Sequence, residues 1–300
     1  MTVEGVALGR MLYYDPILSS NGLTCSSCHI ASKSFSTPLF MSSSGNMKSV
    51  PPHINLAWNP DYNWNGSEPK LDHLCLGDFG PEFFNTDMNE LVRRIKKHSV
   101  YPQMFNNAFG IHNISTISHD DLKQKIVYAI SQFMRSMVSA DSKFDRYLRN
   151  EITLTQSELS GYIIFMTEKG DCFHCHGAPL FTSNDFRNNG LECFPQGDNR
   201  GRFLVTDNIH DRGKFSVPTL RNVELTAPYM RDGRFQTLEE VVEFYNSGVC
   251  SSSPNIDPNM TKPAKLYGLQ LLPQEKTNLV DFLKTLTDTI YISNPEYNRP

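Results

Sequence analysis

The sequence contains no long apolar run, and its fully apolar stretches span only a few residues, such as positions 163–166. A helix needs roughly 20 apolar residues to cross a bilayer, so we expect no membrane-spanning helix. A large charge of one sign is also missing, because the formal net charge is −4 and the isoelectric point is about 6.1. The chain therefore has no broad basic field that would attract nucleic acid or anionic lipid.

The N-terminus opens Met1-Thr2-Val3-Glu4 and lacks the basic start and apolar run of a signal peptide. The sequence is therefore that of a cytoplasmic chain or that of a mature form without its signal. Its 300 residues are 39% hydrophobic and 20% charged, which is an ordinary globular composition and a length sufficient for two domains. The cysteine pattern decides between a cytoplasmic chain and a mature, exported one.

Four of the seven cysteines form two copies of one pattern, Cys25-Ser26-Ser27-Cys28-His29 and Cys172-Phe173-His174-Cys175-His176. A Cys-x-x-Cys-His run is the attachment signature of c-type haem. Each thiol adds to a haem vinyl group, and the adjoining imidazole turns to the iron as its axial ligand. The sequence therefore predicts two covalently bound c-type haems, with His29 and His176 as iron ligands.

Three other uses of cysteine are less compatible with this spacing. Zinc sites use Cys-x-x-Cys pairs that lie about 15 to 20 residues apart, whereas these pairs are separated by most of a domain. A thioredoxin-like pair needs a βαβ pattern, and a disulfide framework suits small secreted chains. Bacteria attach haem outside the cytoplasm, so we expect a periplasmic protein. In that oxidising space Cys193 and Cys250 can pair and leave Cys75 free, although the sequence does not fix the pairing.

Helical patterns dominate, and alternating strand patterns are scarce. Helices are expected around residues 6–12, over 89–97, over 122–137 with a cap at Ser118, from Thr155 to Gly170, from Thr237 through Tyr245, and over 274–286. A Ser- and Pro-rich loop is expected over 32–52. In each half a helix leads into the Cys-x-x-Cys-His motif, which predicts a mainly α fold of two cytochrome c-like domains, residues 1–153 and 154–300.

Several segments then resemble the bacterial di-haem cytochrome c peroxidase/MauG family across nearly the whole chain: residues 8–16, 63–66, 217–223, 225–233 and 237–248. The resemblance implies that the first haem, on His29, is the site where hydrogen peroxide reacts. It also implies that the second haem, on His176, is six-coordinate and transfers electrons. Trp64 matches the Trp that lies between the two haems of the family; the alternative is an ordinary core aromatic.

The resemblance places the second ligand of the second haem at Tyr245, where classical peroxidases have Met and MauG-like members have Tyr. Phenolate stabilises oxidised iron, whereas a thioether favours ferrous iron and raises the potential. Tyr245 therefore predicts a MauG-like subgroup and a second haem of low potential. By helix spacing alone Tyr245 would be a packing residue four positions after Val241, and Met230 is the rival ligand.

Peroxide cleavage needs an acid-base group above the first iron, and the family uses a Gln and a Glu in the segment after the Trp. Here the Gln position is Leu74, and the Glu position aligns best with Asp87, with Glu82 as second choice. His73 adjoins the Gln position and is a further candidate. Carboxylates of this kind are more often solvated surface residues, so a chain that has lost the acid-base pair stays an alternative.

Two further expectations come from the family pattern. No His lies between Ile30 and Pro52, where activation-dependent peroxidases carry a blocking His, so we expect an open, five-coordinate first haem. The family also binds calcium between its haems. At matching positions this chain has Thr226 and Pro228, with Ser49 in place of the Asn and Asn55 nearby. Calcium is possible rather than expected, because a missing oxygen ligand weakens a hard-cation site.

The predicted function is that of a di-haem oxidoreductase that uses hydrogen peroxide as oxidant. Its electrons would come from a small cytochrome c or cupredoxin, or from an oxidisable side chain of a protein substrate. The rival hypothesis is a non-catalytic di-haem electron carrier or sensor. We expect no nucleic-acid partner and no membrane-spanning helix, and the sequence does not decide whether the protein forms a homodimer.

Overall fold

The computed structural model describes residues 1–37, 40–41, 47–265 and 268–300. The predicted loop over 32–52 lies partly outside these residues. The α-helices are α1 (Val3–Tyr14), α2 (Cys25–Cys28), α3 (Leu71–Leu74), α4 (Met88–Lys97), α5 (Tyr101–Phe109), α6 (His119–Ser136), α7 (Lys143–Leu148), α8 (Gln156–Phe165), α9 (Phe203–Thr206), α10 (Leu238–Glu243), α11 (Pro273–Lys284) and α12 (Thr289–Ser293). The described strands form two short antiparallel pairs, β1 (Phe40–Met41) with β2 (Met47–Lys48) and β3 (Phe186–Arg187) with β4 (Phe215–Ser216). The predicted mainly α class is confirmed.

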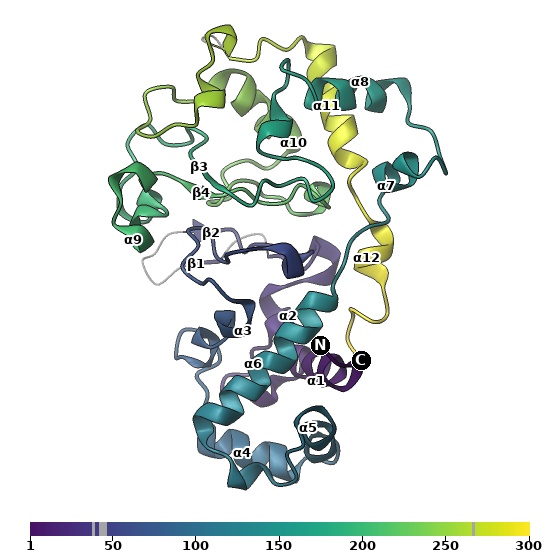
Figure 1. Cartoon of the computed structure of the whole chain (residues 1–300), viewed down its shortest axis with the longest axis vertical. Coiled ribbons are helices and arrows are strands. Elements are labelled where there is room, and N and C mark those ends of the chain that lie inside the picture. Colours follow the sequence, from purple (N-terminus) through teal and green to yellow (C-terminus); the bar gives the residue numbers. More distant parts are fainter. Residues whose placement is uncertain (38–39, 42–46, 266–267) are drawn as a thin grey trace.

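Both halves of the chain repeat one helix crossing. In the lower part of Figure 1, α1 packs against α6, and in the upper part α8 packs against α11. A glycine lies at each crossing: a Cβ added to Gly9 would lie 1.9 Å from the carbonyl oxygen of Ala129, and one added to Gly161 would lie 1.9 Å from that of Asn278. Only a residue without a side chain allows these backbones to approach so closely. The repeat supports two related units.

Each half also has its own hydrophobic core. The first includes Tyr13 and Phe133, and the second includes Phe165 and Phe282. Two elements cross the boundary predicted after residue 153. Phe144 of α7 packs in the second core, whereas Tyr291 of α12 packs in the first. The C-terminal segment thus returns to the first half, where both termini lie (Figure 1). The domain boundary itself stays a prediction.

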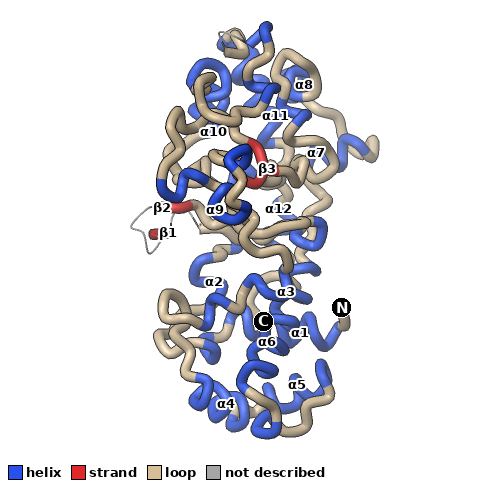
Figure 2. Tube along the Cα trace, turned by 60° about the vertical axis from the view of Figure 1, so that its left-hand side comes forward, coloured by secondary structure: helices blue, strands red, loops and turns tan. Residues whose placement is uncertain are grey.

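The predicted helix starts are confirmed by their caps. Ser118 accepts a hydrogen bond from the backbone N–H of Asp121 at the start of α6, and capping boxes at Thr155 and Thr237 begin α8 and α10. The prediction that the helix after Thr155 reaches Gly170 is wrong, because α8 ends at Phe165. The sequence also gave no sign of α5 or α7. Loops occupy much of the second half, between α8 and α10 (Figure 2).

Within the described residues, no helix combines the length and the apolar character that a membrane crossing requires.

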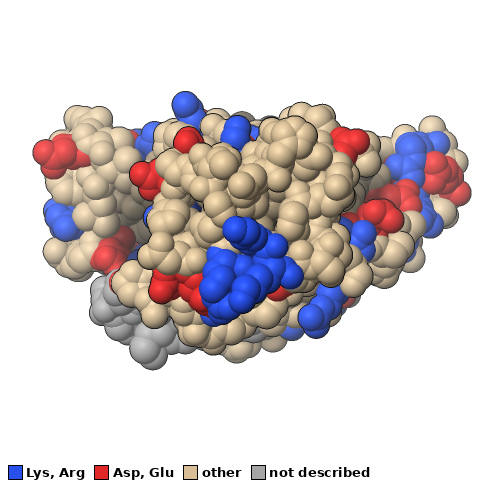
Figure 3. All heavy atoms as spheres, turned by 90° about the horizontal axis from the view of Figure 1, so that it is seen from below, with Lys and Arg blue, Asp and Glu red and all other residues tan. Residues whose placement is uncertain are grey.

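Seen from the end where α4 lies, Lys and Arg gather near the middle of the surface (Figure 3). Exposed Arg93, Lys96 and Lys97 belong to α4. Lys96 and Lys97 lie in the last turn of the helix, where positive charge complements its dipole.

Candidate functional site

The second Cys-x-x-Cys-His motif opens into a cavity of about 500 Å³. Cys172, Cys175 and His176 line it, and so do Tyr245 and Met230 from later in the chain. Cofactor sites typically enclose ~300–1,000 Å³ with mostly apolar walls and a few polar groups. Two thiols, an imidazole and a phenol around one such space are the donor set that a covalently attached, six-coordinate haem requires. The residues therefore fit the predicted cofactor.

The two motif histidines are oriented in the same way. The Nδ1–H of His29 donates to the carbonyl of Phe35 at 2.8 Å, and that of His176 donates to the carbonyl of Phe181 at 3.1 Å. A proton held on Nδ1 leaves the Nε2 lone pair free for a metal. Loss of contact with water lowers the pKa of both imidazoles to about 4. Both rings are therefore neutral at pH 7, which is the form that binds iron.

The carbonyl acceptors were missed at the sequence level, because any residue carries a backbone carbonyl. Phe35 and Phe181 share a left-handed backbone, with φ of 56° and 54°, and both side chains are buried. This conformation is unusual for a bulky residue. The two halves therefore hold their motif histidines with the same local geometry.

The seven cysteines divide into five free thiols and one disulfide pair. Cys25, Cys28, Cys172, Cys175 and Cys75 are free thiols, and Cys193 is paired with Cys250. The pairing that the sequence left open is thus present, and Cys75 is left free. Burial raises the pKa of Cys172 to about 12 and that of Cys25 still further.

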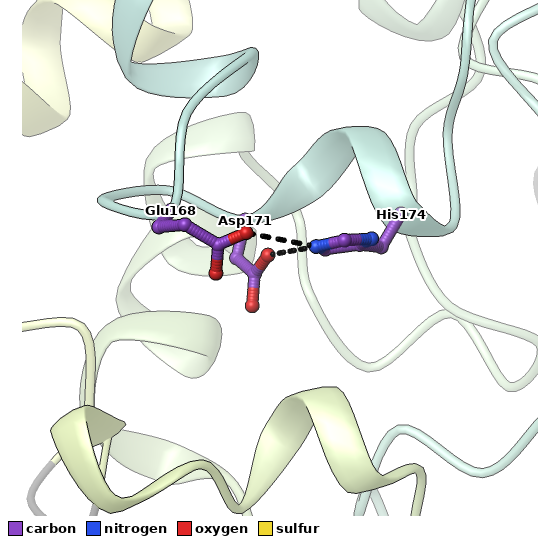
Figure 4. Close-up of side chains that lie close together, drawn as sticks. All are labelled: Glu168, Asp171 and His174. Carbon is purple, nitrogen blue, oxygen red and sulfur yellow. Dashed lines mark hydrogen bonds and ion pairs between the residues drawn. The ribbon is translucent and has the colours of Figure 1, made fainter.

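Over the described part of the chain, one group of three side chains lies close enough together to hold a metal ion, and it contains no cysteine. It consists of Glu168, Asp171 and His174, whose ligand atoms lie within 4.8 Å of one another (Figure 4). The Nζ of Lys262 lies 2.6 Å from Glu168 and 2.9 Å from Asp171, and Lys265 also pairs with Asp171. The ammonium groups of Lys262 and Lys265 already supply the positive charge that the buried carboxylate of Asp171 needs. The cluster therefore fixes the loop before Cys172.

Tyr245 lies in a π-helical turn, Phe244–Gly248, that continues α10. Such turns are rare and are frequently found at functional sites, because the wider turn redirects side chains. The amide Nδ2 of Asn189 donates to the Tyr245 hydroxyl at 3.1 Å. Burial raises the pKa of the phenol to about 12. The structure thus brings Tyr245 to the cavity of His176, and it brings the rival Met230 there as well.

Trp64 lines the same cavity although it belongs to the first half of the sequence. Its indole Nε1–H donates to the carbonyl of Ser49 at 2.7 Å, and its own carbonyl accepts from the backbone N–H of Ser216 at 2.8 Å. Ser49 in turn donates its backbone N–H to the carbonyl of Arg231. Trp64 is therefore fixed at the contact between the two halves.

The candidates for the distal acid lie elsewhere than expected. The carboxyl of Asp87 is exposed and accepts hydrogen bonds from the backbone N–H groups of Asn89 and Glu90, which makes Asp87 the N-cap of α4. Glu82 is exposed as well, and the ring of His73 is 42% exposed and faces Glu68. Asp87 and Glu82 therefore both face solvent, and their role as the distal acid stays a prediction.

Another carboxylate of this segment points inward. Asp78 lies in a 3₁₀ turn, Gly77–Phe79, and its carboxylate accepts a hydrogen bond from the thiol of buried Cys75. Both haem-attachment thiols of the first motif, Cys25 and Cys28, lie close enough for the charge of Asp78 to raise their pKa. Desolvation raises the pKa of Asp78 itself to about 7, against the opposing hydrogen bond from Cys75. Asp78 was not among the acid-base candidates that the sequence suggested.

The positions named for calcium come together only in part. Ser49, Thr226 and Pro228 all line the cavity of the second motif, but Asn55 does not. The Asn55 side chain is buried, and its amide exchanges hydrogen bonds of 2.9 and 3.1 Å with the backbone of Ser139. The carboxamide of Asn55 thus joins the segment before Leu56 to the segment after α6, and calcium binding stays a prediction.

Comparison with known proteins agrees with this arrangement. A family model described as di-haem cytochrome c peroxidase matches residues 3–153. The methylamine utilization protein MauG of Methylorubrum extorquens is 32% identical over 295 residues, covering 95% of this chain and 79% of that protein. The cytochrome c551 peroxidase of Nitrosomonas europaea is 30% identical over 303 residues, covering 98% and 81%.

Solved structures show the same architecture. A crystal structure of a MauG-like protein associated with microbial copper homeostasis has a TM-score of 0.85 at 32% identity, covering 100% of this chain and 94% of that one. A diheme peroxidase from Burkholderia thailandensis has a TM-score of 0.81 at 20% identity, covering 99% and 90%, and this likeness concerns the fold alone. Together with the matched sequences and the paired histidine sites, these similarities show that the chain belongs to the di-haem cytochrome c peroxidase/MauG family of haem oxidoreductases.

Proposed function

We propose that the chain carries two c-type haems, one at each Cys-x-x-Cys-His motif, and that it couples the reduction of hydrogen peroxide to the oxidation of a redox partner. One observation carries the proposal. The cavity of the second motif gathers Cys172, Cys175, His176, Tyr245 and Trp64 around one space. Bound haem would supply the exchange of electrons with peroxide and the storage of oxidising equivalents.

The two haem sites have different surroundings, which suits a division of labour. At the second motif, His176 and Tyr245 line one cavity, so a haem bound there would have the phenol as a donor besides the imidazole. Asn189 stabilises negative charge on the phenol oxygen through its hydrogen bond. At the first motif the sequence holds no His between Ile30 and Pro52. A haem held by His29 would therefore take no second ligand from a histidine of this loop and could bind peroxide there.

Proton movement at the first site is the task of Asp78 rather than Asp87 or Glu82. Reduction of one peroxide to two waters consumes two electrons and two protons, and a base must move a proton from the near oxygen to the leaving one. With its pKa near 7, the carboxylate of Asp78 can both accept that proton and release it at neutral pH. Cys75 holds the carboxyl group in place through its thiol hydrogen bond.

Trp64 is the proposed carrier of oxidising equivalents between the halves. Its indole N–H is bound to the Ser49 carbonyl, which stabilises positive charge on the oxidised ring. The electrons would come from a small cytochrome c or cupredoxin, or from the side chain of a protein substrate. Tyr245 favours the second, MauG-like use. A periplasmic location is part of this proposal, since covalent haem attachment occurs there.

A non-catalytic electron carrier or sensor is the second candidate. It is favoured by Leu74 at the position of the family Gln and by the surface positions of Asp87 and Glu82. The two candidates share both haems and differ in peroxide turnover.

The test uses holoprotein matured in a host that attaches c-type haem. A pyridine haemochrome assay on the denatured chain should give two haems, and a Cys172→Ala/Cys175→Ala variant should retain one. Steady-state assays should then show peroxide-dependent oxidation of a reduced small cytochrome or of a protein donor. A chain with two haems that oxidises neither donor would support the carrier hypothesis instead.

A further inference from the structure

His53 lies directly against the proximal histidine of the first motif. The ring centroids of His29 and His53 are 3.5 Å apart, and the ring planes differ by 20°. His53 is buried, with 8% of its surface exposed. Nearly parallel rings at this distance are in full van der Waals contact, so rotation of one imidazole would push against the other.

His53 is itself held from three sides. Its Nδ1 is hydrogen-bonded to the hydroxyl of Tyr13 at 3.1 Å, and Tyr13 is completely buried. Its backbone N–H donates to the carbonyl of Phe35 at 3.2 Å. Its own carbonyl accepts a hydrogen bond from the hydroxyl of Tyr291. The ring of His53 is therefore a rigid surface rather than a mobile filler.

The same Phe35 carbonyl also accepts the Nδ1–H of His29 at 2.8 Å. One backbone group thus fixes both histidines, and stacking adds a restraint that a single hydrogen bond does not give. A single hydrogen bond restrains the imidazole at one atom only, and its tolerance in angle leaves the ring some freedom to tilt. Contact with a flat, fixed ring removes this freedom.

The second motif lacks this restraint. His176 has the matching bond to the Phe181 carbonyl, but among the ring contacts of the described residues none involves His176. His53 therefore distinguishes the first haem site from the second. Because it stacks on the proximal His29, it does not occupy the opposite, open position.

We propose that His53 is a positioning residue for the first haem: its ring fixes the plane of the His29 imidazole and so the orientation of that ligand about the iron–nitrogen bond. The inference rests on the proposed haem at residues 25–29. Groups next to a metal-bound histidine set its orientation and thereby tune the metal. A single ligand orientation gives the iron one well-defined ligand field.

The experiment compares His53→Leu with His53→Phe in the holoprotein. Leucine fills the space without a flat ring, whereas phenylalanine keeps the stacked ring and loses only the bond to Tyr13. The matched control is His112→Leu, because His112 is an exposed residue of the same half. The readouts are the electron paramagnetic resonance spectrum of the oxidised protein and the iron–histidine stretching band of the reduced first haem.

In His53→Leu the first-haem signal should broaden or split and the stretching band should shift, while the signals of the second haem stay unchanged. His53→Phe should restore the narrow signal and the native band, and His112→Leu should leave both untouched. Native spectra in His53→Leu, or equal disturbance in His53→Phe, would overturn the stacking role. Haem content separates this outcome from failure of the proposed function, which would show as fewer than two haems in the unmutated chain.

If His53→Leu does not fold, His53→Phe decides alone. A native stretching band then supports the stacked ring as the restraint, and a shifted band refutes it.

Discussion

Replacement of Asp78 by Asn tests the proposed chemistry most directly. The carboxamide has nearly the same shape and cannot accept the proton of peroxide. General acid-base groups typically contribute 10²–10⁴-fold to a rate, which corresponds to about 3–5 kcal/mol of transition-state stabilisation. We expect the second-order rate constant for peroxide to fall by a factor of about 10²–10⁴, with the content of covalently bound haem unchanged.

The dependence on pH follows from the state of this carboxyl group. Its pKa is raised to about 7 because the partly buried carboxylate is poorly hydrated. The base form accepts the first proton, so kcat/KM for peroxide should fall as the pH drops through about 7 and level off above it. The Asp78→Asn variant should lose this step in the profile and keep a flat, low rate.

Stopped-flow mixing of the holoprotein with peroxide across this pH range provides the assay. Asp87→Asn and Glu82→Gln are the matched controls, since both remove a carboxylate from the same segment at the surface. Asp87→Asn keeps a residue that also caps helices, so its stability should change little. A native rate in Asp78→Asn, or a rate lost in Asp87→Asn instead, would refute the assignment.

Three other outcomes are expected. Tyr245→Phe removes the phenol oxygen from the cavity of His176, so the spectrum of the second haem should change and its potential should rise; an unchanged redox titration would rule out the ligand role. Gly161→Ala should destabilise the chain by about 1–3 kcal/mol in urea, because the new methyl group would lie 1.9 Å from the Asn278 carbonyl oxygen; Gly77→Ala, with nothing within 4 Å, is the control. Arg221→Met should cost about 3–5 kcal/mol, since it leaves buried Asp145 without the two 2.8 Å bonds of its partner; adding Asp145→Asn should recover part of that loss.

Some of the site could be predicted because its chemistry is contiguous in the sequence. Cys25 to His29 and Cys172 to His176 specify attachment and ligation within five residues each, and no tertiary information is needed. The helix starts at Ser118, Thr155 and Thr237 are predictable for the same reason, because a cap and its partner lie three residues apart.

The rest depends on contacts between distant segments. The stacking of His53 on His29, with Tyr13 behind it, joins three places in the chain that no spacing rule connects. The roles of the Phe35 and Phe181 carbonyls cannot be predicted from the sequence, because every residue carries a backbone carbonyl. Tyr245 is placed in the cavity by a π-helical turn, and regular helix spacing would assign it to packing.

Asp78 and Asp87 differ in their surroundings. Alignment along the segment favoured Asp87, but the chemistry of a carboxylate depends on what covers it. Asp87 is exposed and accepts two backbone N–H groups as the cap of α4. Asp78 is poorly hydrated and has one weak thiol donor, so its pKa moves to about 7. A turn of three residues, Gly77–Phe79, places Asp78 beside the buried thiol of Cys75, and these surroundings are the reason for proposing Asp78 as the group that transfers a proton at neutral pH.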